Sequence, residues 1–119
     1  MQAFQLGEVL RQLSGGGRAW RELLRVDSLS LGVYRLRPGQ EDLQQPHTED
    51  EVYFVVSGRA AFEVEGARRS VGPGTILFVE RRVPHRFVDV TEELVLVVFF
   101  TPPEHSQKEG ERSGFGAQG

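Results

Sequence analysis

The feature that most constrains this sequence is a period-two alternation of apolar and polar side chains that begins beyond Trp20. It is clearest in residues 29–33 and 60–65, and a short apolar run follows at 76–78. Such alternation is typical of β-strands, whose successive side chains point to opposite faces. Glycine and proline turns, including one expected at Ser57-Gly58, interrupt it about every 8 to 12 residues, without helical patterns of useful length between them. We therefore predict an all-β fold of about seven or eight short antiparallel strands, arranged as a sandwich or barrel.

One short helix precedes these strands. The segment Gln5–Leu13 places its apolar side chains at helical spacing, and the run Gly15–Gly17 ends it. A helix this short is marginal alone, so its apolar face must dock on something larger. We predict a helix and leading strand segment in residues 1–25, a β-barrel in 26–104 and a flexible tail in 105–119. The glycine-rich composition of the tail cannot compensate the entropy lost on ordering.

The strand expected at Leu94–Phe100 is apolar at every position and therefore has no face suited to solvent. An uncovered strand of this kind would be a site of association or aggregation. Either the amino-terminal helix or a second subunit must lie against it. We predict a homodimer.

Composition excludes several classes of function. The 14 basic and 17 acidic residues give a net charge of -3, which provides no sequence-wide attraction for a phosphate backbone, so we expect no nucleic-acid partner. Apolar runs stay far shorter than the roughly 20 residues that cross a bilayer, and the first residues lack a signal-peptide core. We expect a cytoplasmic protein without a membrane partner. Cysteine is absent, which excludes disulfides, thiol catalysis and cysteine-ligated metals.

Two histidines are candidates for a metal site. His47, Glu49 and Glu51 share parity, and in an extended chain their side chains lie on one face together with Gln45. Tyr53 continues that face into the core. A carboxylate buried beside an imidazole requires positive compensation, and a divalent cation commonly provides it. The alternative is a solvated acidic loop, with the strand starting only after this stretch.

The second candidate, His85, follows Pro84 at the start of a predicted strand and shares a face with Phe87, so it can point into the barrel. The alternative is a surface histidine at a strand entrance. His105 lies in the glycine-rich tail, and we assign it to solvent.

The stretch from residue 39 to residue 58 resembles the first motif of the cupins, which contains a glycine, a His-x-His pair, a glutamate and a second glycine. Gly39, His47, Glu51 and Gly58 stand at the expected places. The departure is Gln45, which occupies the place of the first histidine.

The stretch from residue 66 to residue 89 is similar to the second cupin motif, which contains a glycine, a Pro-x-Gly turn, a histidine and an asparagine. Gly66, Gly74 and His85 match this motif. Gly72 replaces the proline, and Asp89 stands at the asparagine position. The interval before the histidine is longer than in the bare motif, as in many small cupins.

The resemblance covers roughly Val26–Pro103. It implies a jelly-roll barrel of two antiparallel sheets, usually dimeric, with a metal near one mouth held by the residues matching His47, Glu51 and His85. Cupins include dioxygenases, isomerases, decarboxylases, cyclases, sugar-handling proteins and binding modules, so the fold alone does not select an activity.

Combining the resemblance with the parity of the strand, we expect His47, Glu51 and His85 to bind one divalent metal ion per chain, with the amide oxygen of Gln45 as a fourth ligand. Two imidazoles and one carboxylate approach the set that leaves positions open for substrate and dioxygen on ferrous iron. Fe(II) is therefore the favoured ion, and Mn, Ni, Co and Zn are compatible. Glu49 is either an alternative oxygen ligand, an acceptor for an imidazole N–H, or a carboxylate at the rim.

Further side chains are candidates for the surroundings of the metal. Tyr53 is expected to contribute a phenol. For most of the aromatic candidates, packing in the core is the simpler interpretation. For most of the arginine candidates, the simpler interpretation is a charged residue on the surface. The candidate pocket walls are Tyr34, Tyr53, Phe62, Phe78 and Phe87, and the candidate clamps for a substrate carboxylate are Arg35, Arg37, Arg81, Arg82 and Arg86.

Three functional hypotheses follow. The leading one is a metal-dependent enzyme that performs a dioxygenase-type oxidation of a small organic molecule. The second is an oxygen-independent isomerase or decarboxylase, in which Glu49 or Tyr53 carries a proton. The third is a ligand-binding cupin without turnover, which the substitution of Gln45 for a histidine favours.

Overall fold

Antiparallel strands make up nearly all regular structure in the computed structural model, which describes residues 1–13, 19–43 and 46–106. The all-β jelly-roll prediction is confirmed. Most of the predicted tail, from residue 107 on, and the predicted ligand Gln45 lie outside the described residues. The elements in chain order are α1 (Leu6–Gln12), β1 (Ala19–Arg25), β2 (Ser30–Leu36), β3 (Asp50–Val64), β4 (Ala67–Val71), β5 (Ile76–Val79) and β6 (His85–Thr101).

The described strands form one folded sheet in the order β1-β2-β6-β3-β4, and β5 pairs with the first part of β3, on the edge away from β6. The path is not closed into a complete barrel. The described residues contain six strands, fewer than predicted, because β3 has 15 residues and β6 has 17. We expected a turn at Ser57-Gly58, but this dipeptide lies inside β3, where the pairing register with β6 shifts.

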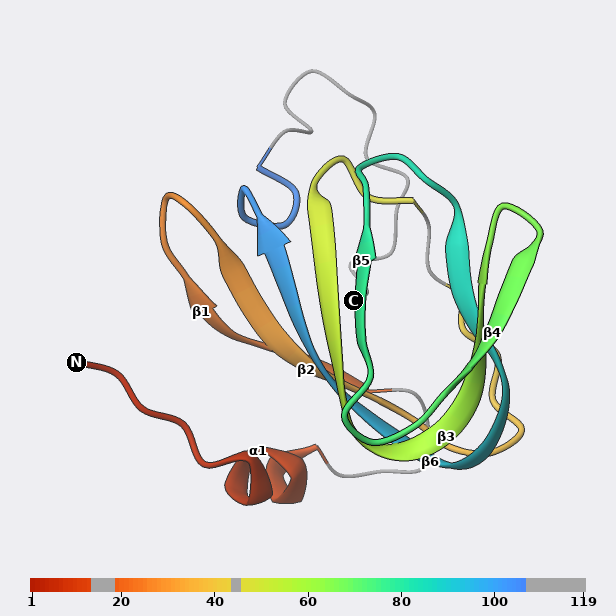
Figure 1. Cartoon of the computed structure of the whole chain (residues 1–119). Helices are drawn as coiled ribbons and strands as arrows, with labels where there is room; N and C mark the ends of the chain where they lie inside the picture. The colour runs from red at the N-terminus through yellow and green to blue at the C-terminus, as the bar shows by residue number, and fades with distance from the viewer. Residues whose placement is uncertain (14–18, 44–45, 107–119) are drawn as a thin grey trace.

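The bend at this register shift determines the shape of the molecule. Figure 1 shows β3 and β6 curving together across the bottom of the molecule, from the side of the folded sheet that contains β1 and β2 to the side that contains β4. Gly58 has φ +95, and a Cβ added to it would lie 2.2 Å from the carbonyl oxygen of Glu93. Because β-bulges increase local twist and bend a strand, the two halves of β3 come to face each other across the interior.

Inward-facing side chains from both sides of the folded sheet form the main core. In β3 the alternation buries Tyr53, Val55 and Phe62 and exposes Phe54, as period-two patterning requires. The other buried apolar members include Tyr34, Leu36, Val71, Leu77, Val79, Phe87, Leu94, Leu96, Val98 and Phe100.

The helix α1 covers the outer face of the sheet, as Figure 1 shows at the lower left. Its buried Val9 packs with Val33 of β2 and Val95 of β6. The predicted docking of the helix is therefore confirmed, although it covers only part of the apolar strand, and Phe99 remains half-buried. Within the described ranges, none of the helices has the length and apolar character needed to cross a bilayer.

The bend gives a testable prediction about two glycines with positive φ. Gly58→Ala should destabilise the protein far more than Gly39→Ala, because only the first substitution places a Cβ against backbone atoms. Strain at positive φ alone costs about 1–2 kcal/mol, and overpacking adds about 1–3 kcal/mol. Urea denaturation of the two variants measures the difference. Equal costs at both positions would contradict the steric role of Gly58.

Candidate metal centre

Three nearly inaccessible side chains converge inside the bend. One carboxylate oxygen of Glu51, Oε1, lies 3.0 Å from Nε2 of His85 and 3.5 Å from Nδ1 of His47. The exposed fractions of the side chains are 5% for His47, 1% for Glu51 and 2% for His85. One donor atom from each lies within 4.8 Å of the other two. The structure therefore brings these three of the predicted residues together.

Local structure explains how the first two residues reach the interior. Glu51 stands near the start of β3, between Val79 of β5 and Phe100 of β6, and strand alternation turns its side chain inward. His47 lies just before the strand. Its carbonyl oxygen accepts the backbone N–H of Arg82, which ties it to the loop that leads to β6.

The third residue, His85, enters from the opposite half of the bent sheet, where it pairs with Val64. Its Nδ1 lies 2.8 Å from the carbonyl oxygen of Val83, and because a carbonyl only accepts, Nδ1 is the donor. Nε2 is thereby left facing Glu51 and the hydroxyl of Tyr53, which is 3.0 Å away.

Burial and charge oppose each other in this cluster. Burial lowers the pKa of His47, but its hydrogen bond with Glu104 and its close contacts and charge interactions with Glu104 and Glu51 outweigh that effect and raise the pKa to about 10. Burial raises the pKa of Glu51, but the two histidines lower it further than burial raises it. The pKa of His85 is likewise raised, with burial opposed by Glu51 and the Val83 carbonyl.

The donor atoms of this cluster fit a divalent cation. Nδ1 of His47 and both oxygens of Glu51 are buried but have no hydrogen-bond partner, so the short contacts among them lack hydrogen-bond geometry. Buried polar atoms without partners are costly, and a metal ion bound between them would satisfy all three. Two imidazole nitrogens and one carboxylate suit several first-row divalent metals. His47, Glu51 and His85 could therefore hold a metal ion.

Glu49 takes a different position from the one expected. It is 1% exposed, so of the three alternatives considered for it, a carboxylate at the rim does not fit this position. Its Oε2 accepts a hydrogen bond from the hydroxyl of Thr48 at 2.5 Å. Glu49 does not belong to the converging group found among the described residues.

The carboxyl-terminal segment supplies a residue that the sequence analysis missed. Oε2 of Glu104 lies 3.0 Å from Nε2 of His47. The assignment of His105 to solvent is wrong, since its side chain is only 30% exposed and its Nε2 lies 3.4 Å from the same glutamate oxygen. The pairing register of β3 and β6 indicates the contact between His47 and Glu104. Asp50 pairs with Thr101, and continuing outward by three residues on each strand brings His47 opposite Glu104.

The candidate wall residues are only partly confirmed. Tyr53, Phe62 and Phe87 are buried around His85, with the Phe62 ring 5.8 Å from the imidazole. Phe78 is 63% exposed on the outer face and cannot be a pocket wall. Tyr34 donates a hydrogen bond to the buried Asp42, which the sequence analysis also missed.

Most of the candidate clamp arginines are paired with acidic side chains of the protein itself. These ion pairs favour a structural role over recognition of a substrate carboxylate. The pairs are Arg35 and Arg37 with Glu93, Arg81 with Asp50, and Arg86 with Glu63.

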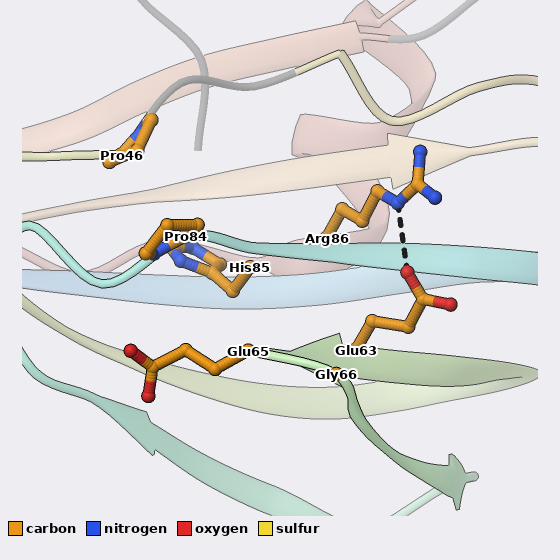
Figure 2. A pocket seen from close by; sticks show the side chains of 7 residues that line it. All are labelled: Pro46, Glu63, Glu65, Gly66, Pro84, His85 and Arg86. Atoms are coloured by element: carbon orange, nitrogen blue, oxygen red, sulfur yellow. Dashed lines mark hydrogen bonds and ion pairs between the residues drawn. The ribbon is translucent and has the colours of Figure 1, made fainter.

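A pocket of about 340 Å³ has His85 among its lining residues. Figure 2 shows Pro84 beside the imidazole and the hydrogen-bonded pair of Arg86 and Glu63 on another side. The pocket therefore adjoins one member of the candidate centre, whose side chain is itself only 2% exposed. Its lining residues are Pro46, Glu63, Glu65, Gly66, Pro84, His85 and Arg86.

Comparisons with known proteins agree with this architecture. The family model of the cupin domain matches residues 32–101. An uncharacterised protein of Streptomyces coelicolor is 41% identical over 104 residues, which cover 87% of this chain and 99% of that protein.

Solved structures of other proteins are also similar to this chain. The DMSP lyase DddQ from Ruegeria pomeroyi is 26% identical with a TM-score of 0.67, and the match covers 71% of this chain but only 47% of the lyase. This chain thus spans about half the length of that enzyme. An RmlC-like cupin protein from Desulfovibrio desulfuricans is similar in fold, with a TM-score of 0.74, 18% identity, and coverage of 87% of this chain and 98% of that one.

Metal binding is expected to release protons and to weaken in acid. With a pKa of about 10, His47 is protonated at neutral pH without metal, and coordination requires an unprotonated ring nitrogen. The association constant for Zn²⁺ should rise about tenfold per pH unit for each proton displaced between about pH 6 and pH 8. Calorimetry in two buffers of different ionisation enthalpy counts the protons, and at least one is expected.

The metal-free protein is the control for this measurement. A raised pKa means that the stabilisation from protonated His47 is complete below about pH 6.5 and is lost progressively as the pH rises from there through about 10. This histidine therefore gives the metal-free protein no acid-induced loss of stability near neutral pH. A Zn²⁺ affinity independent of pH would contradict the expected displacement.

Proposed function

The chain belongs to the cupin family, and from that membership we propose that it is a metal-dependent enzyme acting on a small organic molecule. The convergence of two imidazoles and one carboxylate at His47, Glu51 and His85 carries the proposal. The pocket that His85 helps to line supports it, since it offers space for a small molecule next to one of these residues.

The favoured reaction is a dioxygenase-type oxidation. When bound, a ferrous ion held by two histidines and one carboxylate supplies redox chemistry on dioxygen and polarises substrate oxygens. Fe(II) is accordingly the proposed ion, at one per chain, with Mn, Ni, Co and Zn as compatible ions. Gln45 remains the proposed fourth ligand.

The protein's own residues bind and orient the substrate in this proposal. Pro46 and Pro84 present rigid apolar surface at the pocket, which suits the carbon skeleton of a small molecule. Arg86 and Glu63 neutralise each other across 3.0 Å, so the charge open to a ligand on this side is small. Phe62 packs beside His85 and restricts the water that reaches the imidazole.

A second candidate is an oxygen-independent reaction, such as elimination, isomerisation or decarboxylation. The observation in its favour is the hydroxyl of Tyr53, 3.0 Å from Nε2 of His85, which places a phenol within reach of a substrate proton. The likeness to a lyase at 26% identity supports it further. Glu49 is the alternative proton carrier, as a carboxylate buried in the same stretch of chain.

Oxygen dependence separates these candidates. Protein reconstituted with Fe(II) should consume dioxygen with a substrate from a panel of small organic acids, alcohols and diketones. His47→Ala and His85→Ala should lower this rate by at least about a hundredfold, because each removes a metal ligand. Glu92→Gln is the matched control, since that side chain is 62% exposed and forms its ion pair with Arg59, outside the candidate centre.

Other outcomes of the same experiment decide against oxidation. Turnover that persists under strict anaerobiosis would reject the dioxygenase and support the second candidate. Activity that survives both histidine substitutions would reject a metal-dependent enzyme altogether. Binding of panel compounds without turnover under any condition would identify a ligand-binding cupin.

We further propose that the protein forms a homodimer through the outer apolar patch, defined here as Phe54, Ile76 and Phe78. These side chains are 38%, 68% and 63% exposed, and they lie together because Phe54 pairs with Ile76 in the sheet. Phe99, half-buried on the neighbouring strand, extends the patch. A second copy suits this surface because, in a two-fold dimer, one apolar patch can pack on its own copy.

Charge placed in the outer apolar patch should produce a monomer. Phe78→Glu would bury an unpaired carboxylate at the interface, which a dimer of this kind cannot accommodate. Leu43→Glu is the control, because Leu43 is equally exposed at 63% but lies outside the patch. Analytical ultracentrifugation of wild type and both variants measures the mass. A monomeric wild type, or a dimeric Phe78→Glu variant, would contradict the proposal.

A further inference from the structure

Glu104 occupies a buried position that its place in the sequence does not suggest. It follows the last strand, in the segment after Thr101, yet it is only 2% exposed. Its Oε2 lies 3.0 Å from Nε2 of His47. The antiparallel register of β3 and β6 leads to this contact, because the two residues lie equally far beyond the Asp50–Thr101 pair.

The backbone of Glu104 is also anchored. Its N–H donates to the hydroxyl of Ser30 at 2.9 Å, and its carbonyl oxygen accepts a hydrogen bond from the guanidinium of Arg25 at 2.5 Å. Both partners lie at the β1–β2 hairpin, on a different part of the sheet from His47. A glutamate held at three points is suited to fixing the orientation of the group it contacts.

The contact determines which nitrogen of His47 faces the other ligands. A carboxylate only accepts hydrogen bonds, so Nε2 of His47 is the donor and keeps its proton. Nδ1 is then the nitrogen that points toward Glu51, 3.5 Å from its Oε1. His85 shows the same arrangement with the nitrogens exchanged, since its Nδ1 donates to the Val83 carbonyl and its Nε2 faces Glu51.

From this symmetry we propose that Glu104 is a positioning residue of the metal centre, which holds the Nε2–H of His47 and directs Nδ1 to the metal. The inference rests on the proposed metal site, but not on any catalytic activity. Glu104 itself lies outside the group of donor atoms that converge within 4.8 Å, which favours positioning over direct coordination. His105 is a neighbour of the same carboxylate oxygen, at 3.4 Å.

The role of Glu104 is tested by Zn²⁺ binding and by the tautomer of His47. Calorimetry should show Zn²⁺ affinity lowered about 10- to 100-fold in Glu104→Ala, as for other residues that orient metal ligands. Glu104→Gln keeps the shape and one acceptor oxygen, so it should lose less Zn²⁺ affinity than Glu104→Ala. It also provides a second variant for the test if Glu104→Ala does not fold. Glu92→Gln, an exposed matched substitution, should bind as wild type does.

Nitrogen-15 NMR of the imidazoles supplies the decisive readout. In the Zn²⁺-loaded wild type, His47 should carry its proton on Nε2 and bind through Nδ1, whereas His85 should carry it on Nδ1 and bind through Nε2. Coordination through Nε2 of His47, or unchanged Zn²⁺ affinity in folded Glu104→Ala, would overturn the role of Glu104 and leave the metal centre standing. A wild type that binds no Zn²⁺ would reject both. Normal binding without turnover would refute only the enzymatic proposal.

Discussion

The bend of β3 and β6 is the constraint on which the rest of the structure depends. Glu51 and His85 lie near opposite ends of a long strand pair, since Glu51 pairs with Phe100 and His85 with Val64. In a flat sheet these side chains would be far apart. The register shifts around Gly58 fold the sheet so that their atoms come within 3.0 Å. The absence of a side chain at Gly58 is therefore a requirement of the candidate site as well as of the fold.

The bend also encloses several carboxylates whose negative charge must be compensated. Glu49, Glu51 and Glu104 are each 2% exposed or less. Buried carboxylates are tolerated only with compensating charge or hydrogen bonds, and removing one partner of a buried pair costs about 3–5 kcal/mol. Protonated His47 provides compensation in the metal-free protein, and a divalent ion would provide it in its place. The polar centre itself does not stabilise the fold. Burial of the apolar side chains around this cluster does.

Much of this could be predicted from the sequence, because side-chain alternation in a strand is local information. Parity placed His47 and Glu51 on the inner face, and helical spacing identified α1. The bulge at Gly58 was mistaken for a turn because positive φ serves both structures. Glu104, the last residue of the predicted barrel, was missed because its position depends on register with β3, which composition does not reveal. The pairing of the arginines and the exposure of Phe78 likewise depend on neighbours distant in sequence.

One strand, β3, contributes to two surfaces of opposite character. Glu51 and Tyr53 face the candidate centre, while Phe54 lies in the outer apolar patch. Because successive residues alternate between the faces, inserting or deleting a single residue here would exchange the two sides. Aromatic rings would then enter the polar interior and the carboxylate would reach the exterior. Over evolutionary time this strand should accept changes of residue type more readily than changes of length.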